Sequence, residues 1–135
     1  MRPHNLTIKA FGPFGEETTV DFDAMGNSVY LIAGETGVGK TSVFDALVYA
    51  LYGTASGTGR SGLSTEELHS DLAKHDGKKE EMRVSLSFSN AGKEYRVSRR
   101  MYWGKDGRSK TISRESELTE NGALLVSGKG AEKKR

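Results

Sequence analysis

Cysteine is absent from the 135-residue sequence, which excludes both a disulfide framework and a thiolate metal site. Apolar runs are short, far below the about 20 residues that a helix needs to cross a bilayer. The first ten residues, MRPHNLTIKA, contain no apolar stretch of the kind found in secretion signals. Together these absences lead us to expect a cytoplasmic protein.

A large excess of charge of one sign is also missing, since 20 basic and 18 acidic residues give a net charge of +2. Such a balance does not by itself indicate a nucleic-acid partner. The charges are unevenly distributed, however. Acidic residues gather in Glu16–Asp23 and Glu66–Asp71, whereas Arg96–Lys110 is almost purely basic. The overall composition suits one soluble domain with one core.

The first part of the chain is predicted to form strands. Alternating apolar residues indicate half-buried antiparallel strands at His4–Phe11 and Glu17–Phe22. The continuous apolar run Val29–Ala33 predicts a strand that is buried on both faces.

A helix is predicted from Thr41 to about Tyr52, ended by Gly53. It is apolar nearly all round, so we expect deep burial, with Tyr49 and Tyr52 both in the core. Asp45 is its one charged residue, and we expect this carboxylate to contact a polar group of a neighbouring loop.

Beyond the helix, Gly53–Gly62 predicts a loop, and the capping residues at the start of Ser64–Lys74 predict a short helix. Alternation from Glu81 onward predicts a β-hairpin, and two further strands are expected at Lys110–Leu118 and Ala123–Val126. We predict one lobe over residues 1–127, with a β-hairpin region at 81–127 and a charged tail at 128–135.

The segment GETGVGKT, residues 34–41, matches G-x-x-x-x-G-K-[ST] at every fixed position. Glycines let the backbone wrap around phosphate, and the following helix adds its positive amino-terminal end. Lys40, the candidate catalytic residue, brings a full charge to the β- and γ-phosphates, and the Thr41 hydroxyl suits Mg²⁺. The predicted nucleotide-binding residues are Gly34, Glu35, Thr36, Gly37, Val38, Gly39, Lys40, Thr41 and Ser42, with the Glu35 side chain pointing to solvent.

Two other features of nucleotide hydrolases are missing from the sequence. No apolar strand after the phosphate loop ends in the acidic residue that a P-loop hydrolase uses to hold Mg²⁺. A guanine-reading Asn-Lys-x-Asp motif is absent too, which argues against a GTPase. We therefore expect the amino-terminal part of a longer ATPase, which alone binds nucleotide weakly and hydrolyses almost none.

The phrases LTIKAFGPFGEETTVDF and VYLIAGETGVGKTSVFDALVYALYGTASG resemble the amino terminus of the SbcC family, the ATPase subunits of bacterial SbcCD nucleases. The later phrases HSDLA and GKEYRVSRRMYWGKDGRSK fit the same family. The resemblance covers essentially the whole chain. Its most specific part is FDALVYALYG directly after the phosphate loop.

This resemblance implies an α/β fold, namely the amino-terminal lobe of an ABC-type P-loop ATPase head with a mixed or antiparallel β-sheet. It also implies ATP and Mg²⁺ as cofactors. The implied partners are the carboxy-terminal segment of the same protein, a second ATPase head, an SbcD-like nuclease and DNA. In this family, ATP-driven dimerisation of two heads controls a nuclease that acts on DNA ends and hairpins.

Two details of the resemblance concern the nucleotide. Archaeal double-strand-break-repair counterparts carry an arginine after the first strand, where this chain has Gly12, so we assign no such contact. Adenine contacts are expected around Ser70–Ala73, without a choice of residue.

The basic hairpin region carries the candidate DNA-binding residues Arg96, Arg100, Lys105, Arg108 and Lys110. Arg96, Arg100 and Tyr102 are predicted to share the face opposite Val97 and Met101. A basic strand face with aromatic residues suits a nucleic-acid backbone. The alternative interpretation is a solvated sheet face.

Three other classes of protein compete with this interpretation. Another coiled-coil chromosome or repair ATPase would share the head architecture and differ beyond residue 135. A small P-loop kinase or related enzyme would need a lid and an acceptor site, and the sequence shows neither. A non-catalytic DNA-binding module would fail to bind nucleotide.

Overall fold

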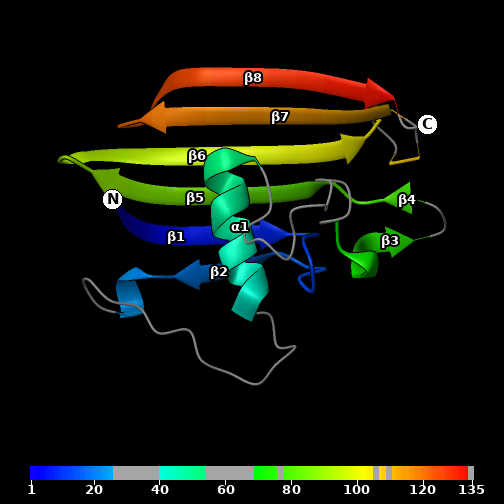
Figure 1. Cartoon of the computed structure of the whole chain (residues 1–135), viewed down its shortest axis with the longest axis horizontal. Helices are drawn as coiled ribbons and strands as arrows, with labels where there is room; N and C mark the ends of the chain where they lie inside the picture. Colours follow the sequence, from blue (N-terminus) through cyan, green and yellow to red (C-terminus); the bar gives the residue numbers. More distant parts are fainter. Residues whose placement is uncertain (26–39, 54–68, 76–77, 105–106, 109–110, 134–135) are drawn as a thin grey trace.

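Figure 1 presents the computed structural model, which describes residues 1–25, 40–53, 69–75, 78–104, 107–108 and 111–133. The predicted strand Val29–Ala33, most of the predicted loop after Gly53 and the phosphate loop up to Gly39 lie outside these described residues.

A six-stranded sheet with the order β2-β1-β5-β6-β7-β8 dominates the structure, and each neighbouring pair is antiparallel. Over the described residues, the remaining elements are the helix α1, two 3-10 turns and a two-stranded hairpin. The bounds of the sheet strands are β1 Arg2–Lys9, β2 Thr18–Asp21, β5 Met82–Asn90, β6 Lys93–Trp103, β7 Thr111–Glu120 and β8 Ala123–Lys133. The other bounds are η1 Asp23–Met25, α1 Lys40–Tyr52, η4 Asp71–Ala73, β3 Lys74–His75 and β4 Lys78–Lys79.

Two-residue turns join β5 to β6 and β7 to β8. In the second turn Asn121 and Gly122 have φ angles of 49° and 86°, and in the first turn Ala91 and Gly92 have φ angles of 52° and 79°. Positive φ at both central residues matches the right-handed twist of the flanking strands. These turns therefore set the register of both hairpins.

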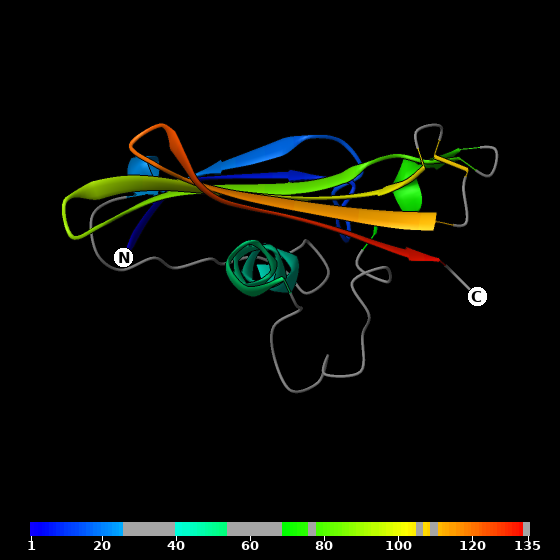
Figure 2. The same ribbon diagram turned by 90° about the horizontal axis from the view of Figure 1, so that it is seen from above.

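Helix α1 covers one face of the sheet and crosses the strands, as the end-on view of Figure 2 shows. Its small buried residues Ala46 and Ala50 allow close approach to β5 and β6. The strands contribute apolar side chains at every second position, because alternate residues point to the same face. The fully buried members are Leu6, Ile8, Met82, Val84, Leu86 and Met101.

The opposite face of the sheet carries polar residues at the intervening positions, and the described elements leave it without a covering helix (Figure 2). The predicted alternation in the β5–β6 hairpin is therefore confirmed. Antiparallel pairing and a helix that covers one sheet face, as seen in the described residues, fit an α/β ATPase lobe.

Three expectations about local structure are wrong. The described part of Ser64–Lys74 contains the short 3-10 turn η4 and the start of β3 instead of an α-helix. Strand β8 continues to Lys133, beyond the predicted end at Val126, because it pairs with β7 along its whole length. Tyr52 is 73% exposed, whereas Tyr49 is buried as predicted.

Candidate functional site

The first turn of α1 is formed by Lys40, Thr41 and Ser42, the last residues of the predicted phosphate loop. A helix start leaves four backbone N–H groups without partners inside the helix and carries a partial positive charge. Both features suit an anion at this end of α1. The predicted nucleotide contacts of Gly34, Glu35, Thr36, Gly37, Val38 and Gly39 lie outside the described residues, so those contacts remain predictions.

Packing against the sheet holds α1 in place near its middle and its carboxy-terminal half. Phe11 lies in the loop after β1, and the centroid of its ring is 5.7 Å from the centroid of the Tyr49 ring. Burial raises the pKa of Tyr49 above its ordinary value of 10.0, although Arg99 and Arg114 act against this. The hydroxyl therefore stays protonated at neutral pH. Asp45 is also buried, at 1% exposure, on the helix.

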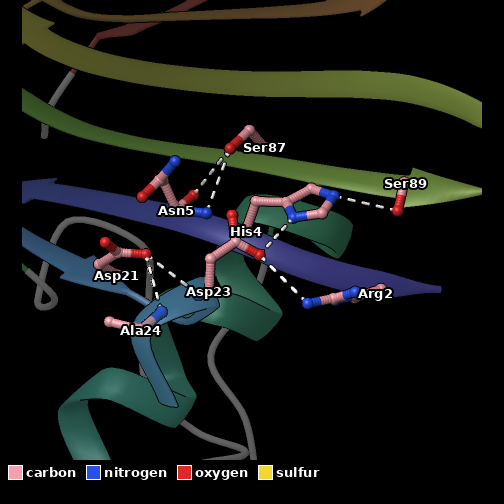
Figure 3. Close-up of polar contacts among 8 residues, drawn as sticks. All are labelled: Arg2, His4, Asn5, Asp21, Asp23, Ala24, Ser87 and Ser89. Atoms are coloured by element: carbon pink, nitrogen blue, oxygen red, sulfur yellow. Dashed lines mark hydrogen bonds and ion pairs between the residues drawn. The ribbon is translucent and has the colours of Figure 1, made fainter. Parts of the chain in front are cut away.

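A cluster of polar side chains fixes η1, which lies directly before residue 26 (Figure 3). The His4 ring lies between Asp23 and Ser89, with 2.7 Å from Nδ1 to Asp23 Oδ1 and 3.0 Å from Nε2 to Ser89 Oγ. Arg2 Nη2 adds a longer contact of 3.6 Å to the same carboxylate oxygen. The cluster ties β1, β5 and η1 together.

The order Ser89, His4, Asp23 is also the order of a hydrolytic triad. Ser89 lies on a regular strand that pairs with β1 and β6 on its two sides, whereas a nucleophilic serine of α/β-hydrolases stands on a sharp exposed turn. We therefore interpret the cluster as a structural contact that fixes η1 to β1 and β5, directly before the segment that leads to the phosphate loop.

The segment predicted to contact adenine packs beside the loop after β1. Ser70 N donates to Ala10 O at 2.8 Å, and Phe11 forms a bridge with His69. His69 is buried, with its Nε2 2.7 Å from Glu80 O, so its ring has a structural role here. Leu72 is 69% exposed next to these anchored residues. An adenine contact in Ser70–Ala73 remains a prediction.

Arg96 and Arg100 lie on the sheet face opposite the buried Val97 and Met101, as predicted. Arg96 Nε donates to Ser85 Oγ at 3.1 Å. The guanidinium of Arg100 also lies 4.3 Å above the ring of Tyr102.

Acidic residues share this face, which the sequence reasoning did not anticipate. Arg100 Nε lies 3.4 Å both from Glu81 Oε1 and from Glu115 Oε2, and Tyr102 donates to Glu115 at 3.2 Å. The sequence signal was the alternation Arg114-Glu115-Ser116-Glu117. Alternate residues of a strand share a face, so Glu115 and Glu117 lie on the same face of β7. The face is therefore of mixed charge. Lys105 and Lys110 lie outside the described residues.

A second basic cluster, also missed by the sequence reasoning, lines a cavity of 420 Å³ at one end of the sheet. Lys9, Lys78, Lys79 and Arg100 line it together with the acidic residues Glu80 and Glu81. Lys79 Nζ lies 4.7 Å from the centroid of the Trp103 ring, a cation–π contact. The adjacent pair Lys78-Lys79 was the available signal.

Among the described residues, no group of three His, Asp or Glu side chains is arranged to hold a metal ion. The Mg²⁺ expectation therefore depends on Thr41, a hydroxyl ligand of the kind that P-loops supply. No helix in the described part of the chain is long and apolar enough to span a membrane.

Comparison with known protein families assigns the chain to a family. The family model described as "AAA domain" matches residues 5–134, so the chain belongs to the AAA domain family. Within this class, the chain is similar to SbcC, the C component of nuclease SbcCD, from several bacteria. The predicted resemblance to the amino-terminal part of SbcC is thereby confirmed.

Three SbcC relatives illustrate the similarity. The Vibrio cholerae protein is 39% identical over 73% of this chain and 9% of its own length. The Staphylococcus haemolyticus protein is 42% identical over 79% of this chain and 10% of its own length. The Staphylococcus aureus strain MRSA252 protein is 36% identical over 96% of this chain and 12% of its own length. The chain thus spans about a tenth of the length of these curated relatives.

Proposed function

We propose that this chain is the ATP-binding segment of a DNA-repair ATPase, and that Lys40 and Thr41 hold the nucleotide phosphates and Mg²⁺. The observation that carries the proposal is the motif GETGVGKT, whose last two residues begin a helix packed across the sheet. The donor set fits the ligand, because helix N–H groups, an ammonium and a hydroxyl suit a magnesium triphosphate. Bound Mg²⁺ supplies a Lewis acid at the β- and γ-phosphates.

We further propose that the complete ATPase head needs a carboxy-terminal segment of the same protein and a second head. The partner is an SbcD-like nuclease that acts on DNA double-strand breaks and hairpins in the cytoplasm. The relatives are named as components of nuclease SbcCD, which supports a nuclease partner. Since an acidic residue ending a second apolar strand is missing here, this chain alone hydrolyses almost no ATP.

Reconstitution tests this function. The chain is mixed with the carboxy-terminal segment of its full-length protein, and ATP hydrolysis is measured with and without Mg²⁺. We expect hydrolysis by the mixture in the presence of Mg²⁺ and almost none by either part alone. The proposal fails if the chain alone is as active as the mixture, or if the mixture is as inactive as the chain.

A separate part of the proposal is that DNA contacts the sheet face opposite α1, on which Arg96 and Arg100 lie. The double substitution Arg96→Glu and Arg100→Glu adds two negative charges to those of Glu81 and Glu115, so DNA binding at low salt should weaken by about tenfold or more. Each lost phosphate contact should also lower the slope of log affinity against log salt by about 0.9. Binding to a fluorescent duplex across a salt series measures both quantities.

Lys93→Glu is the control for this prediction, because Lys93 lies at the β5–β6 turn and is half-exposed beside Glu120. If the double variant binds like the wild type at every salt concentration, the face is a solvated surface. That result would not affect the proposal that Lys40 and Thr41 bind the nucleotide.

Two alternatives stay open. Another coiled-coil chromosome or repair ATPase would have the same head, and the sequence beyond residue 135 separates it from the proposed function. A small P-loop nucleotide-binding enzyme would bind ATP and hydrolyse or transfer phosphate without a second segment. Activity of the chain alone in the reconstitution experiment would support this alternative, and activity of the mixture only would exclude it.

A further inference from the structure

The carboxy-terminal end of α1, opposite the proposed phosphate site, is held by an arginine from the sheet. Arg99 lies on β6 between Val97 and Met101, on the face that α1 covers. Its Nε donates to Ala50 O at 2.9 Å, and its Nη2 donates to Leu51 O at 3.3 Å. Both carbonyls belong to the last turn of the helix, which ends at Tyr52.

The chemistry of this contact is specific. The last carbonyls of a helix have no partner inside the helix and carry a partial negative charge. A guanidinium presents several N–H donors in a rigid plane, so one side chain reaches two neighbouring carbonyls. The contact is half-buried, and charge-assisted hydrogen bonds of this kind are stronger than those between neutral groups.

Gly53 makes room for the arginine. Gly53 N donates to Tyr49 O at 2.8 Å and has a φ of 77°, the left-handed conformation of a helix end. A Cβ atom added at this position would lie 3.3 Å from Arg99 Nη1, tighter than most Cβ contacts. A side chain here would therefore both strain the backbone and crowd the guanidinium.

Apolar packing holds the middle of α1 against the sheet through Ala46, Ala50 and the ring contact of Tyr49 with Phe11. Such burial is not directional. The two hydrogen bonds from Arg99 are directional and anchor one end. Since 13 residues of helix are about 20 Å long, a tilt of about 3° at this end moves the first turn by about 1 Å.

We propose that Arg99 is a positioning residue for the nucleotide site: it fixes α1 against β6 and thereby places Lys40 and Thr41 at the phosphates. This inference rests on the proposed nucleotide-binding function. Arg99 does not touch the ligand, because it acts at the far end of the helix. A misplacement of about 1 Å at an aligned polar site, even when a distant substitution causes it, is enough to weaken the site strongly.

The experiment uses the full-length protein and compares Arg99→Met, which keeps most of the apolar stem, with Arg99→Lys, which keeps the charge but not the planar set of donors. ATP affinity with Mg²⁺ is measured well below the unfolding temperature, and the thermal midpoint is measured without nucleotide. We expect Arg99→Met to bind ATP about tenfold or more weakly, with Arg99→Lys between it and the wild type.

Arg83→Met is the matched control. Arg83 lies on β5, on the opposite sheet face, and its guanidinium contacts Glu81 Oε1 at 2.7 Å instead of the helix. We expect less than about a twofold change in its ATP affinity.

The outcomes separate the positioning role from the nucleotide site itself. If Arg99→Met lowers the thermal midpoint but leaves ATP affinity unchanged, Arg99 is only structural and the inference is overturned. If Arg99→Met does not fold, the ATP affinity of Arg99→Lys is the deciding measurement. An affinity equal to that of the wild type would then overturn the inference. If the wild type and Lys40→Ala bind ATP equally, the proposed function itself fails and takes the inference with it.

Discussion

Replacing Lys40 with alanine should weaken ATP binding by about 100-fold or more. The substitution removes the one full positive charge that the motif brings to the β- and γ-phosphates, whereas the backbone N–H groups of the loop and helix remain. Hydrogen bonds to charged groups are worth about 1.5–3 kcal/mol each, and each 1.4 kcal/mol is a factor of ten in affinity. Titration of the full-length protein with Mg²⁺ and a fluorescent ATP analogue measures the loss.

Lys93→Ala is the control for Lys40→Ala. This exposed lysine lies 3.6 Å from Glu120 at the β5–β6 turn, far along the chain from the phosphate loop. It should change ATP affinity by less than about twofold. Circular dichroism should show that both variants keep the wild-type fold. Equal affinity of Lys40→Ala and the wild type would exclude the proposed phosphate site.

Truncation of Leu86 should have the largest effect on stability. Leu86 is fully buried on β5 at the centre of the sheet, between Leu6 on β1 and Val97 on β6, and it faces α1. Leu→Ala substitutions at buried positions cost about 2–5 kcal/mol, because the lost apolar contact adds to an unfilled cavity. Small domains unfold with about 5–15 kcal/mol in total. Urea unfolding followed by circular dichroism should therefore show a clearly lower midpoint.

The same substitution at Leu124 provides the comparison. Leu124 lies at the start of β8 and is 61% exposed. Its truncation removes little buried area, so the free energy of unfolding should change by less than about 0.5 kcal/mol. Similar losses at Leu86 and Leu124 would contradict the placement of the core between α1 and the sheet.

Most of the hairpin architecture was predictable, because its signals are local. Met82, Val84 and Leu86 alternate with polar residues, and this period of two fixes both the strand and its buried face. The Asn121-Gly122 pair likewise specifies a turn whose backbone only a few residue types adopt. The motif predicted the start of α1 at Thr41, one residue after its start at Lys40, and Gly53 predicted its end at Tyr52.

Other features depend on partners that are distant in the sequence. Strand β8 extends to Lys133 because β7 offers a partner along its whole length, although Gly128, Gly130 and the charged residues carry no apolar signal. Asp71–Ala73 forms a 3-10 turn directly after Ser70, whose N–H donates to Ala10 O, and this tertiary contact overrides the helix-capping signal upstream.

Side-chain environments were the least predictable part of the candidate site. Arg100 was placed on the correct face, but its two glutamate neighbours come from the end of a loop before β5 and from β7. Arg99 was not distinguished from the other basic residues of its strand, because its partner is the backbone of a helix 48 and 49 positions away in the sequence. Tyr52, at the last position of α1, is exposed although its neighbours along the helix are apolar.

Amide hydrogen exchange of the full-length protein, with and without Mg²⁺ and ATP, tests the phosphate site most directly. A nucleotide held by this loop predicts new protection centred on the backbone N–H groups of residues 37–42, with little change on β7 and β8. Exchange that stays unchanged in residues 34–42 at saturating ATP, or protection confined to another part of the chain, would contradict it.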